Sequence, residues 1–204
     1  MPTRTYEQRL RAESAEQTRR RILEALYEQL REAPSQPVSI DQIARKARVA
    51  RSTVYLIFGN RAGLFAALST EMLEPGGLDR LREAVADPDA REHLRGGLRA
   101  GMQWLATHRD VYRSLHSMAA LDQEAVGGAI HRQEKNRAGG MAYLAQRLSE
   151  QGVLRADVTV DQAADMLWLL TSFDAFDLLY TGRGLSVDEV AQTLITMAER
   201  SLCR

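Results

Sequence analysis

A short segment near residue 50 holds four side chains that are suited to contacting a polyanion. Arg51, Ser52, Thr53 and Tyr55 occur within five positions. Their guanidinium, hydroxyl and phenol groups donate the hydrogen bonds that proteins make to phosphates and base edges. The segment is expected to form a helix from about Arg51 to Phe58, and a helix of this size fits the major groove of DNA. Residue types and spacing therefore predict a contact with double-stranded DNA.

A second short helix precedes this one at the spacing of a helix-turn-helix. It is predicted over 40–47, behind a capping box formed by Ser39 and Gln42. The turn Arg48-Val49-Ala50 joins the two helices. The apolar residues expected in their small core are Val38, Ile40, Ile43, Val49 and Val54. The alternative is a pair of surface helices in a bundle, with solvated arginines.

The rest of the sequence also has helical character. Capping boxes headed by Ser14, Ser39, Thr159 and Ser186 each precede apolar residues at helical spacing. Asn-Gly and Asp-Gly hairpin turns are missing, and no proline follows Pro88. The expected helices are about 14–32, 40–47, 51–58, 61–73, 78–86, 88–107, 110–118, 122–151, 160–181 and 187–202. These features predict an all-α protein: an N-terminal three-helix helix-turn-helix domain, residues 1–61, and a helical bundle, residues 62–204.

Charge and composition narrow the class of protein. Residues 1–61 hold 12 basic and 7 acidic residues, whereas residues 62–204 hold 15 and 20, so a polyanion partner is expected for the first part alone. The lone cysteine, Cys203, excludes an internal disulfide framework and a thiolate zinc site. No apolar run approaches the roughly 20 residues of a membrane span, and the N-terminus does not resemble a signal peptide. We expect a cytoplasmic protein without a membrane partner.

The histidines show no pattern of a metal or catalytic site. His93, His108, His116 and His131 lack i,i+4 pairing and carboxylates at ligand spacing. The sequence also has no glycine loop that would cradle phosphates. We therefore expect no cofactor, no metal and no enzymatic activity. The alternatives are an enzyme built on a helical bundle and an adaptor whose basic face binds protein, which salt-dependent, sequence-specific DNA binding would exclude.

The turn and the helix after it resemble the TetR family of bacterial transcriptional regulators. From Val49 to Phe65 the segment is VARSTVYLIFGNRAGLF. The family pattern is roughly Gly-Val-Ser-x-x-Thr-hydrophobic-Tyr-x-His-Phe-x-x-Lys-x-x-Leu. The resemblance implies a homodimer that binds a pseudo-palindromic DNA operator, acts as a repressor and is released by a small-molecule effector. An activator, or a regulator without an effector, is also compatible with the sequence.

By this resemblance, the recognition helix supplies most of the DNA contacts. Thr53 and Tyr55 are expected at phosphates, whereas Arg51 and Ser52 lie at the groove-facing start of the helix. The contacts extend to the first helix and to the start of the fourth. The expected DNA-binding residues are Thr18, Arg19, Ser39, Arg48, Arg51, Ser52, Thr53, Tyr55 and Arg61.

Three positions depart from the family pattern. Arg48 stands in place of a glycine, Ala50 in place of a capping serine and Ile57 in place of a histidine. We expect Arg48 to be strained in a left-handed conformation, or to add a phosphate contact. The arm from Arg4 to Arg11 is expected to be a frayed tail, with minor-groove binding as the alternative.

By the same resemblance, the helical bundle carries effector binding and dimerisation. The helix predicted over 160–181 is apolar on two faces, which indicates burial between its own core and a second subunit. The alternative is that both faces serve one monomer core. The expected dimer interface is Ala164, Trp168, Ala175, Leu179, Val187, Ala191, Leu194, Ile195, Ala198 and Leu202.

Aromatic, methionine and polar residues are the candidates for the effector site, because small-molecule pockets combine an apolar lining with a few polar groups. They are Met102, Trp104, His108, Tyr112, His116, Met141, Tyr143, Trp168, Phe173, Asp174 and Asp177. Core packing is the alternative for any one of them. If Asp174 and Asp177 line a cavity, they favour a cationic or hydrogen-bond-donating effector; if they are solvated, they carry no such meaning.

Three glycine pairs fall inside predicted helices: Gly96-Gly97, Gly127-Gly128 and Gly139-Gly140. Each glycine there costs about 1 kcal/mol relative to alanine. Two explanations are open, close approach of another helix and a bend beside the cavity.

Overall fold

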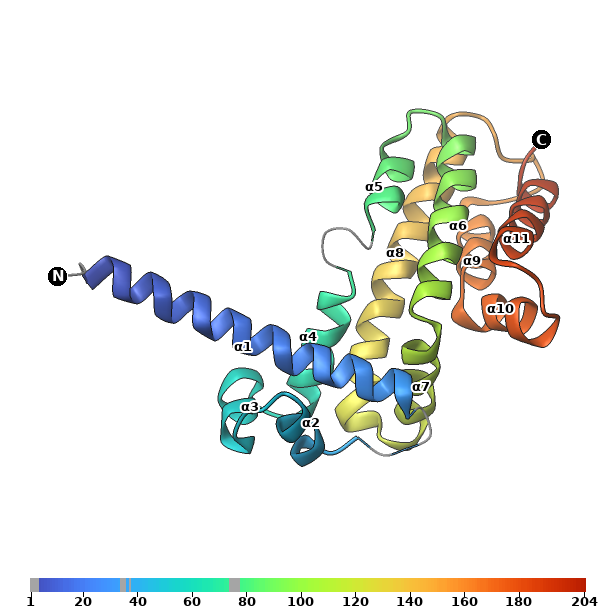
Figure 1. Ribbon diagram of the computed structural model, residues 1–204. Coiled ribbons are helices and arrows are strands. Elements are labelled where there is room, and N and C mark those ends of the chain that lie inside the picture. The colour runs from blue at the N-terminus through green and yellow to red at the C-terminus, as the bar shows by residue number, and fades with distance from the viewer. Residues whose placement is uncertain (1–3, 34–35, 37, 74–77) are drawn as a thin grey trace. The chain divides into compact units, whose positions relative to one another are not determined.

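Helices make up the regular structure of the described residues, apart from one isolated bridge between Leu154 and Cys203 (Figure 1). The computed structural model describes residues 4–33, 36, 38–73 and 78–204. Within these ranges no helix is both long and apolar enough to cross a membrane. The prediction of an all-α chain is confirmed. The chain divides into a first unit, Met1–Met72 with Arg113–Ile130, and a second unit, Leu73–Tyr112 with His131–Arg204.

The first unit is built on one apolar face of its longest helix. Its elements are α1 (Arg4–Glu32), α2 (Ile40–Lys46), α3 (Arg51–Phe58), α4 (Arg61–Glu71), most of α7 (Arg109–Leu121) and the π-helical turn η1 (Gln123–Gly127). Ile22, Leu26 and Leu30 recur at four-residue spacing on α1 and are buried. α1 packs against α2 and α4, and α3 packs against the same two helices. This core supports the short helix α3.

The first helix begins earlier than the sequence predicts. The expected start is Ser14, but α1 begins at Arg4, so the capping box at Ser14 is wrong. Residues 4–13 contain no proline or glycine and are rich in helix-forming residues, so nothing stops the helix there. Arg9 and Glu13 add an ion pair one turn apart. The backbone of the arm that was expected to fray is therefore helical.

The second unit is organised around the long helix α6. Its elements are α5 (Asp79–Ala86), α6 (Ala90–Thr107), the start of α7, most of α8 (Gly128–Glu150), α9 (Val160–Leu170), α10 (Phe173–Asp177), the π-helical turn η2 (Leu178–Gly182) and α11 (Val187–Leu202). α6 packs against α5 and α11, and α9 packs against α11. Buried Leu94 and Leu98 of α6 and Leu194 and Leu202 of α11 belong to the core of this unit.

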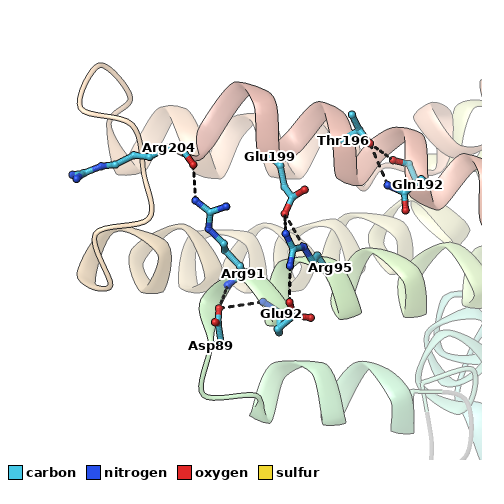
Figure 2. A network of polar contacts seen from close by, with 8 residues as sticks. All are labelled: Asp89, Arg91, Glu92, Arg95, Gln192, Thr196, Glu199 and Arg204. Atoms are coloured by element: carbon cyan, nitrogen blue, oxygen red, sulfur yellow. Dashed lines mark hydrogen bonds and ion pairs between the residues drawn. The ribbon is translucent and has the colours of Figure 1, made fainter.

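Polar contacts also join α6 to α11 (Figure 2). The Arg95 guanidinium donates from Nε to Glu199 at 2.7 Å. Hydrogen bonds to Glu92 and to Glu199 raise the pKa of Arg95. Arg91 donates to the carbonyl of Arg204 at 2.6 Å. These contacts hold the C-terminal end of the chain beside the start of α6.

The helix predicted over 160–181 is interrupted. α9 ends at Leu170, and the Ser172 hydroxyl accepts a hydrogen bond from the Ala175 amide at 3.1 Å, which starts α10. A serine in this role is an ordinary N-cap. The long apolar pattern concealed this restart, because the apolar residues continue at helical spacing on both sides of it.

Other helix starts agree closely with the sequence. The capping boxes at Ser39, Thr159 and Ser186 are confirmed, with both reciprocal hydrogen bonds present in each. α6 begins at Ala90 rather than at the expected residue 88, and the Asp89 carboxylate accepts the amide hydrogen bonds at its start. Each such cap is worth about 1 kcal/mol.

The turn between α2 and α3 holds Arg48 in a left-handed conformation, as predicted, with φ of 55°. The Arg48 amide donates to the Arg45 carbonyl at 3.1 Å, and the Val49 amide donates to the Ala44 carbonyl at 2.9 Å. These bonds fix the turn to the end of α2. A non-glycine residue in this region costs about 1–2 kcal/mol. Ala50, the N-cap of α3, makes no side-chain cap bond.

We expect Arg48→Gly to stabilise the protein by about 0.5–1 kcal/mol, because relief of the left-handed strain exceeds the extra entropy of glycine in the unfolded chain. Arg48→Ala keeps the strain and removes the charge, so it should leave stability nearly unchanged. Denaturant unfolding followed by circular dichroism measures both variants. Equal stability of the glycine and alanine variants would contradict the assignment of strain.

Candidate DNA-contacting surface and ligand cavity

Helix α3 exposes one side that is rich in hydrogen-bond donors. Arg51, Ser52, Tyr55 and Leu56 are exposed, whereas Val54 on the opposite side is buried in the core of the first unit. Burial of Val54 fixes the rotation of this two-turn helix about its axis. The exposed side can therefore enter a groove without any rearrangement of the helix.

Arg51 is already oriented by its neighbours. Its guanidinium donates to the Asp41 carboxylate at 3.2 Å and to the Tyr55 hydroxyl at 3.3 Å, and it lies 5.5 Å from the centre of the Tyr55 ring. The Tyr55 hydroxyl and the Asp41 carboxylate raise the pKa of Arg51. Ion pairs this exposed contribute little to stability. A phosphate or a guanine edge can therefore replace Asp41 at small cost.

The remaining predicted DNA-binding residues differ in exposure and in the hydrogen bonds that they already make. Arg48 is exposed, Thr53 is half-buried and the Ser39 hydroxyl accepts from the Gln42 amide at 3.2 Å. The Thr18 hydroxyl donates to a carbonyl of its own helix at 2.9 Å.

Two predicted phosphate-binding arginines, Arg19 and Arg61, are paired with carboxylates inside the first unit. Arg19 donates to Glu71 at 3.0 Å. Arg61 pairs with Asp122 and lies 5.5 Å from the centre of the Phe65 ring. Either arginine would have to exchange its carboxylate partner for a phosphate.

Leu56 is a residue that the sequence analysis missed. Its side chain is 87% exposed on the same side of α3 as Ser52. A leucine four residues after a groove-facing serine was the available signal, because residues i and i+4 share a face of a helix. An exposed apolar side chain there can contact a thymine methyl group.

The second unit contains a cavity of about 400 Å³. Helices α5, α6, α8, α9, α10 and the start of α7 contribute to its wall, and most of the lining is apolar. Its volume falls in the range of small-molecule sites. Six residues predicted for the effector site line it: Met102, Trp104, Tyr112, Met141, Tyr143 and Phe173.

Polar residues of α8 line one part of this cavity, and the sequence analysis missed them. The Gln133 amide donates to the Tyr112 hydroxyl. Arg137 pairs with Glu134, donates to the Thr171 hydroxyl at 2.8 Å and lies 5.1 Å from the centre of the Trp168 ring. Burial raises the pKa of Tyr112, so its phenol is protonated at neutral pH.

A buried histidine also faces the cavity. The Arg147 guanidinium lies 3.0 Å from Nδ1 of His93. Arginine can only donate, so Nδ1 accepts and the ring is the neutral Nε2–H tautomer. Burial and the charge of Arg147 lower the pKa of His93, and Asp87 opposes them.

The other predicted effector residues lie elsewhere. His108 lines a smaller hollow together with Trp104, and His116 belongs to the first unit. Asp174 is exposed, and Asp177 accepts from Nε of Arg109 at 3.0 Å. Neither carboxylate is among the residues that line the cavity. The cavity therefore gives no support to a cationic ligand held by these two groups.

The predicted dimer residues fall into two groups. The members buried within the chain itself are Ala191, Leu194, Ile195, Ala198 and Leu202. The members at least partly accessible are Ala164, Trp168, Ala175, Leu179 and Val187. Three large apolar residues outside the predicted set, Leu169, Leu178 and Met197, are more exposed, at 63%, 70% and 48%.

Known proteins resemble this chain in sequence over part of the first unit and in structure over both units. The model of the family "Bacterial regulatory proteins, tetR family" matches residues 22–68. Native NalD, the secondary repressor of the MexAB-OprM multidrug efflux pump in Pseudomonas aeruginosa, is 26% identical in sequence; the alignment covers 94% of this chain and 98% of that one, with a TM-score of 0.69. Among curated proteins, no sequence matches this chain.

Two further solved structures share the fold. A TetR-like transcriptional regulator from Rhodococcus sp. RHA1 is 23% identical over 90% of this chain and 94% of that one, with a TM-score of 0.64. The fatty acid degradation regulator FadR from Bacillus halodurans is 16% identical over 89% and 94%, with a TM-score of 0.71. The helical arrangement is therefore shared along nearly the whole chain.

We expect stability to fall as the pH drops below about 6.5, because unfolded His93 binds a proton there while the folded chain resists protonation. The loss should continue until the pH reaches the lowered pKa of the folded state. His93→Gln keeps an acceptor for Arg147 and does not titrate, so it should lose less stability over the same interval. Urea unfolding at a series of pH values measures the difference, and identical pH dependences would contradict it.

Proposed function

Since this chain belongs to the TetR family of bacterial regulatory proteins, we propose that it is a homodimeric repressor that a small-molecule effector releases from a pseudo-palindromic DNA operator. The observation that carries the proposal is the exposed donor side of α3, held by buried Val54 within the segment that the family model matches. NalD, a repressor that is 26% identical, supports the sign of the regulation.

In this proposal, the exposed side of α3 divides into reading and positioning contacts. Arg51 and Ser52, at the start of the helix, contact base edges, and Leu56 contacts a thymine methyl group. Thr53 and Tyr55 donate to phosphates and set the register of the helix. A dimer presents two such helices to two half-sites, which is why the operator is pseudo-palindromic.

The effector is proposed to bind the cavity of the second unit and to act through α7. Tyr112 of α7 lines the cavity. Two residues later, the Ser114 hydroxyl is buried and donates to the Leu30 carbonyl of α1 at 2.8 Å. In this proposal, a ligand-induced change at Tyr112 reaches Ser114, two residues later on the same helix. Coupling between two sites is typically about 1–3 kcal/mol.

The dimer is proposed to form through the exposed apolar residues of α9, η2 and α11. Leu169, Leu178 and Met197 lie on these three elements, and large apolar side chains left exposed by one chain mark association surfaces. Leu194 and Ile195 are buried inside the chain itself, which supports a role for them in its own core.

DNA binding by purified protein tests the reading role. An operator is first selected from random double-stranded DNA. Arg51→Ala should then weaken binding to that operator about 5–150-fold, because a bidentate guanine contact is worth about 1–3 kcal/mol. Tyr55→Phe should weaken binding to all sequences alike. Arg183→Ala, at an exposed arginine of the second unit, is the control. Equal affinity of the Arg51→Ala and control variants would refute this role of α3.

Sedimentation of variants tests the dimer surface. Met197→Glu should give a folded monomer with much weaker operator binding, because it places a charge in the proposed interface. Met197→Leu keeps an apolar side chain of similar size and should remain dimeric. Ile195→Glu buries a charge in the chain's own core and should unfold the second unit instead. A Met197→Glu protein that still sediments as a dimer would place the interface elsewhere.

A further inference from the structure

We propose that Gly101 and Gly140 reserve the ligand space of the cavity in the second unit, and that the molecule they admit is uncharged and largely apolar. The inference rests on the proposed function, since it specifies the effector class of that same cavity. It assigns the two glycines as specificity-determining residues rather than packing residues.

Both glycines occupy the middle of the cavity side of their helices. On α6, Leu98 and Leu105 lie about one turn before and after Gly101, and both line the cavity. On α8, Arg137 and Leu144 flank Gly140 in the same way, and both line the cavity. Residues three and four apart share a helix face, so a side chain at either glycine would project toward the cavity.

Packing of the protein does not require these glycines. Apart from the adjoining backbone of its own helix, a Cβ atom added at Gly101 or Gly140 would meet no atom within 4 Å. Gly96 differs, because a Cβ there would lie 2.9 Å from Cβ of Ala84, so close approach of α5 and α6 explains that glycine. Glycine inside a helix is less stable than alanine. The chain therefore keeps a helix-unfavourable residue at two positions that border the cavity, half-buried Gly101 and exposed Gly140.

The charged residues that line the cavity, among those described, indicate an uncharged ligand. The ionised residues among them, Glu134 and Arg137, pair with each other. His93 accepts from Arg147 and is neutral. A charged ligand would have to break the pair or leave its own charge without a partner in an apolar site, and both are costly. Uncharged polar groups of the lining, among them Gln133, Asn136 and Tyr112, can orient a neutral molecule.

The probe for this space is N-phenyl-1-naphthylamine, a neutral apolar dye whose fluorescence rises on burial. Gly101→Leu and Gly140→Leu should each weaken its binding about tenfold or more, because added methylene groups in an apolar pocket discriminate by about 10–200-fold. Both variants should unfold at the same temperature as the wild type or a higher one, because leucine favours a helix more than glycine does. Loss of binding without loss of stability is the expected signature.

Gly139→Leu is the matched control. Gly139 precedes Gly140 on α8 and does not line the cavity. Beyond the adjoining backbone of its helix, an added Cβ there also meets no atom within 4 Å. The Gly139→Leu variant should therefore bind the dye as the wild type does. Equal binding by the Gly101→Leu, Gly140→Leu and Gly139→Leu variants would overturn the proposal, and so would a wild-type protein that does not bind the dye.

The charge of the occupant is tested by competition. 1-Anilinonaphthalene-8-sulfonate has similar rings and a sulfonate group, so it should displace the neutral dye only at concentrations about tenfold higher or more. Equally effective displacement would overturn the uncharged assignment. These measurements contain no DNA, so a failure of operator binding would refute the proposed repressor and leave the result on the cavity standing.

Discussion

Helix α7 is the constraint on which the proposed regulation depends, because this one continuous helix belongs to both compact units. Its first turn brings Tyr112 to the cavity, and its next turn buries the Ser114 hydroxyl against the Leu30 carbonyl. An α-helix resists local bending because each turn is tied to the next by backbone hydrogen bonds. In the proposed regulation, a ligand that moves the start of α7 acts on Ser114, which contacts α1. The contact at Ser114 is buried, so it would be costly to leave unmade.

The candidate DNA-contacting surface and the cavity differ in how their polar groups are paired. On α3 the candidate DNA-contacting side chains Arg51, Ser52 and Tyr55 are exposed, and Arg51 is held by weak, solvent-screened contacts that a nucleic acid can replace. In the cavity the polar groups are satisfied within the protein, as for Gln133 with Tyr112 and Arg137 with Glu134. An exposed site can exchange partners cheaply, whereas an apolar cavity selects a ligand by shape and by the absence of charge.

Open space in a core reduces stability, because its lining loses contacts that a packed side chain would make. Gly101 and Gly140 add to this cost through their weak helix propensity. The strained backbone of Arg48 is a separate cost in the first unit. These three positions are unfavourable locally, and two of them border the region where a ligand is proposed to bind. Such conflicts between local preference and the whole fold are expected at functional sites.

The sequence by itself determined the helical class, the helix-turn-helix, the left-handed Arg48 and three of the four capping boxes, because these depend on residues close together in the chain. It did not reveal the restart at Ser172, since the apolar pattern runs through that break. Tertiary structure alone decided which apolar face was core: Ile195 is buried against its own chain, whereas Met197 is exposed. It likewise separated Asp177, paired with Arg109, from the cavity, and brought Gln133 and Arg137 to its wall. Periodicity shows that a helix has an apolar face, but only the packed chain decides what covers that face.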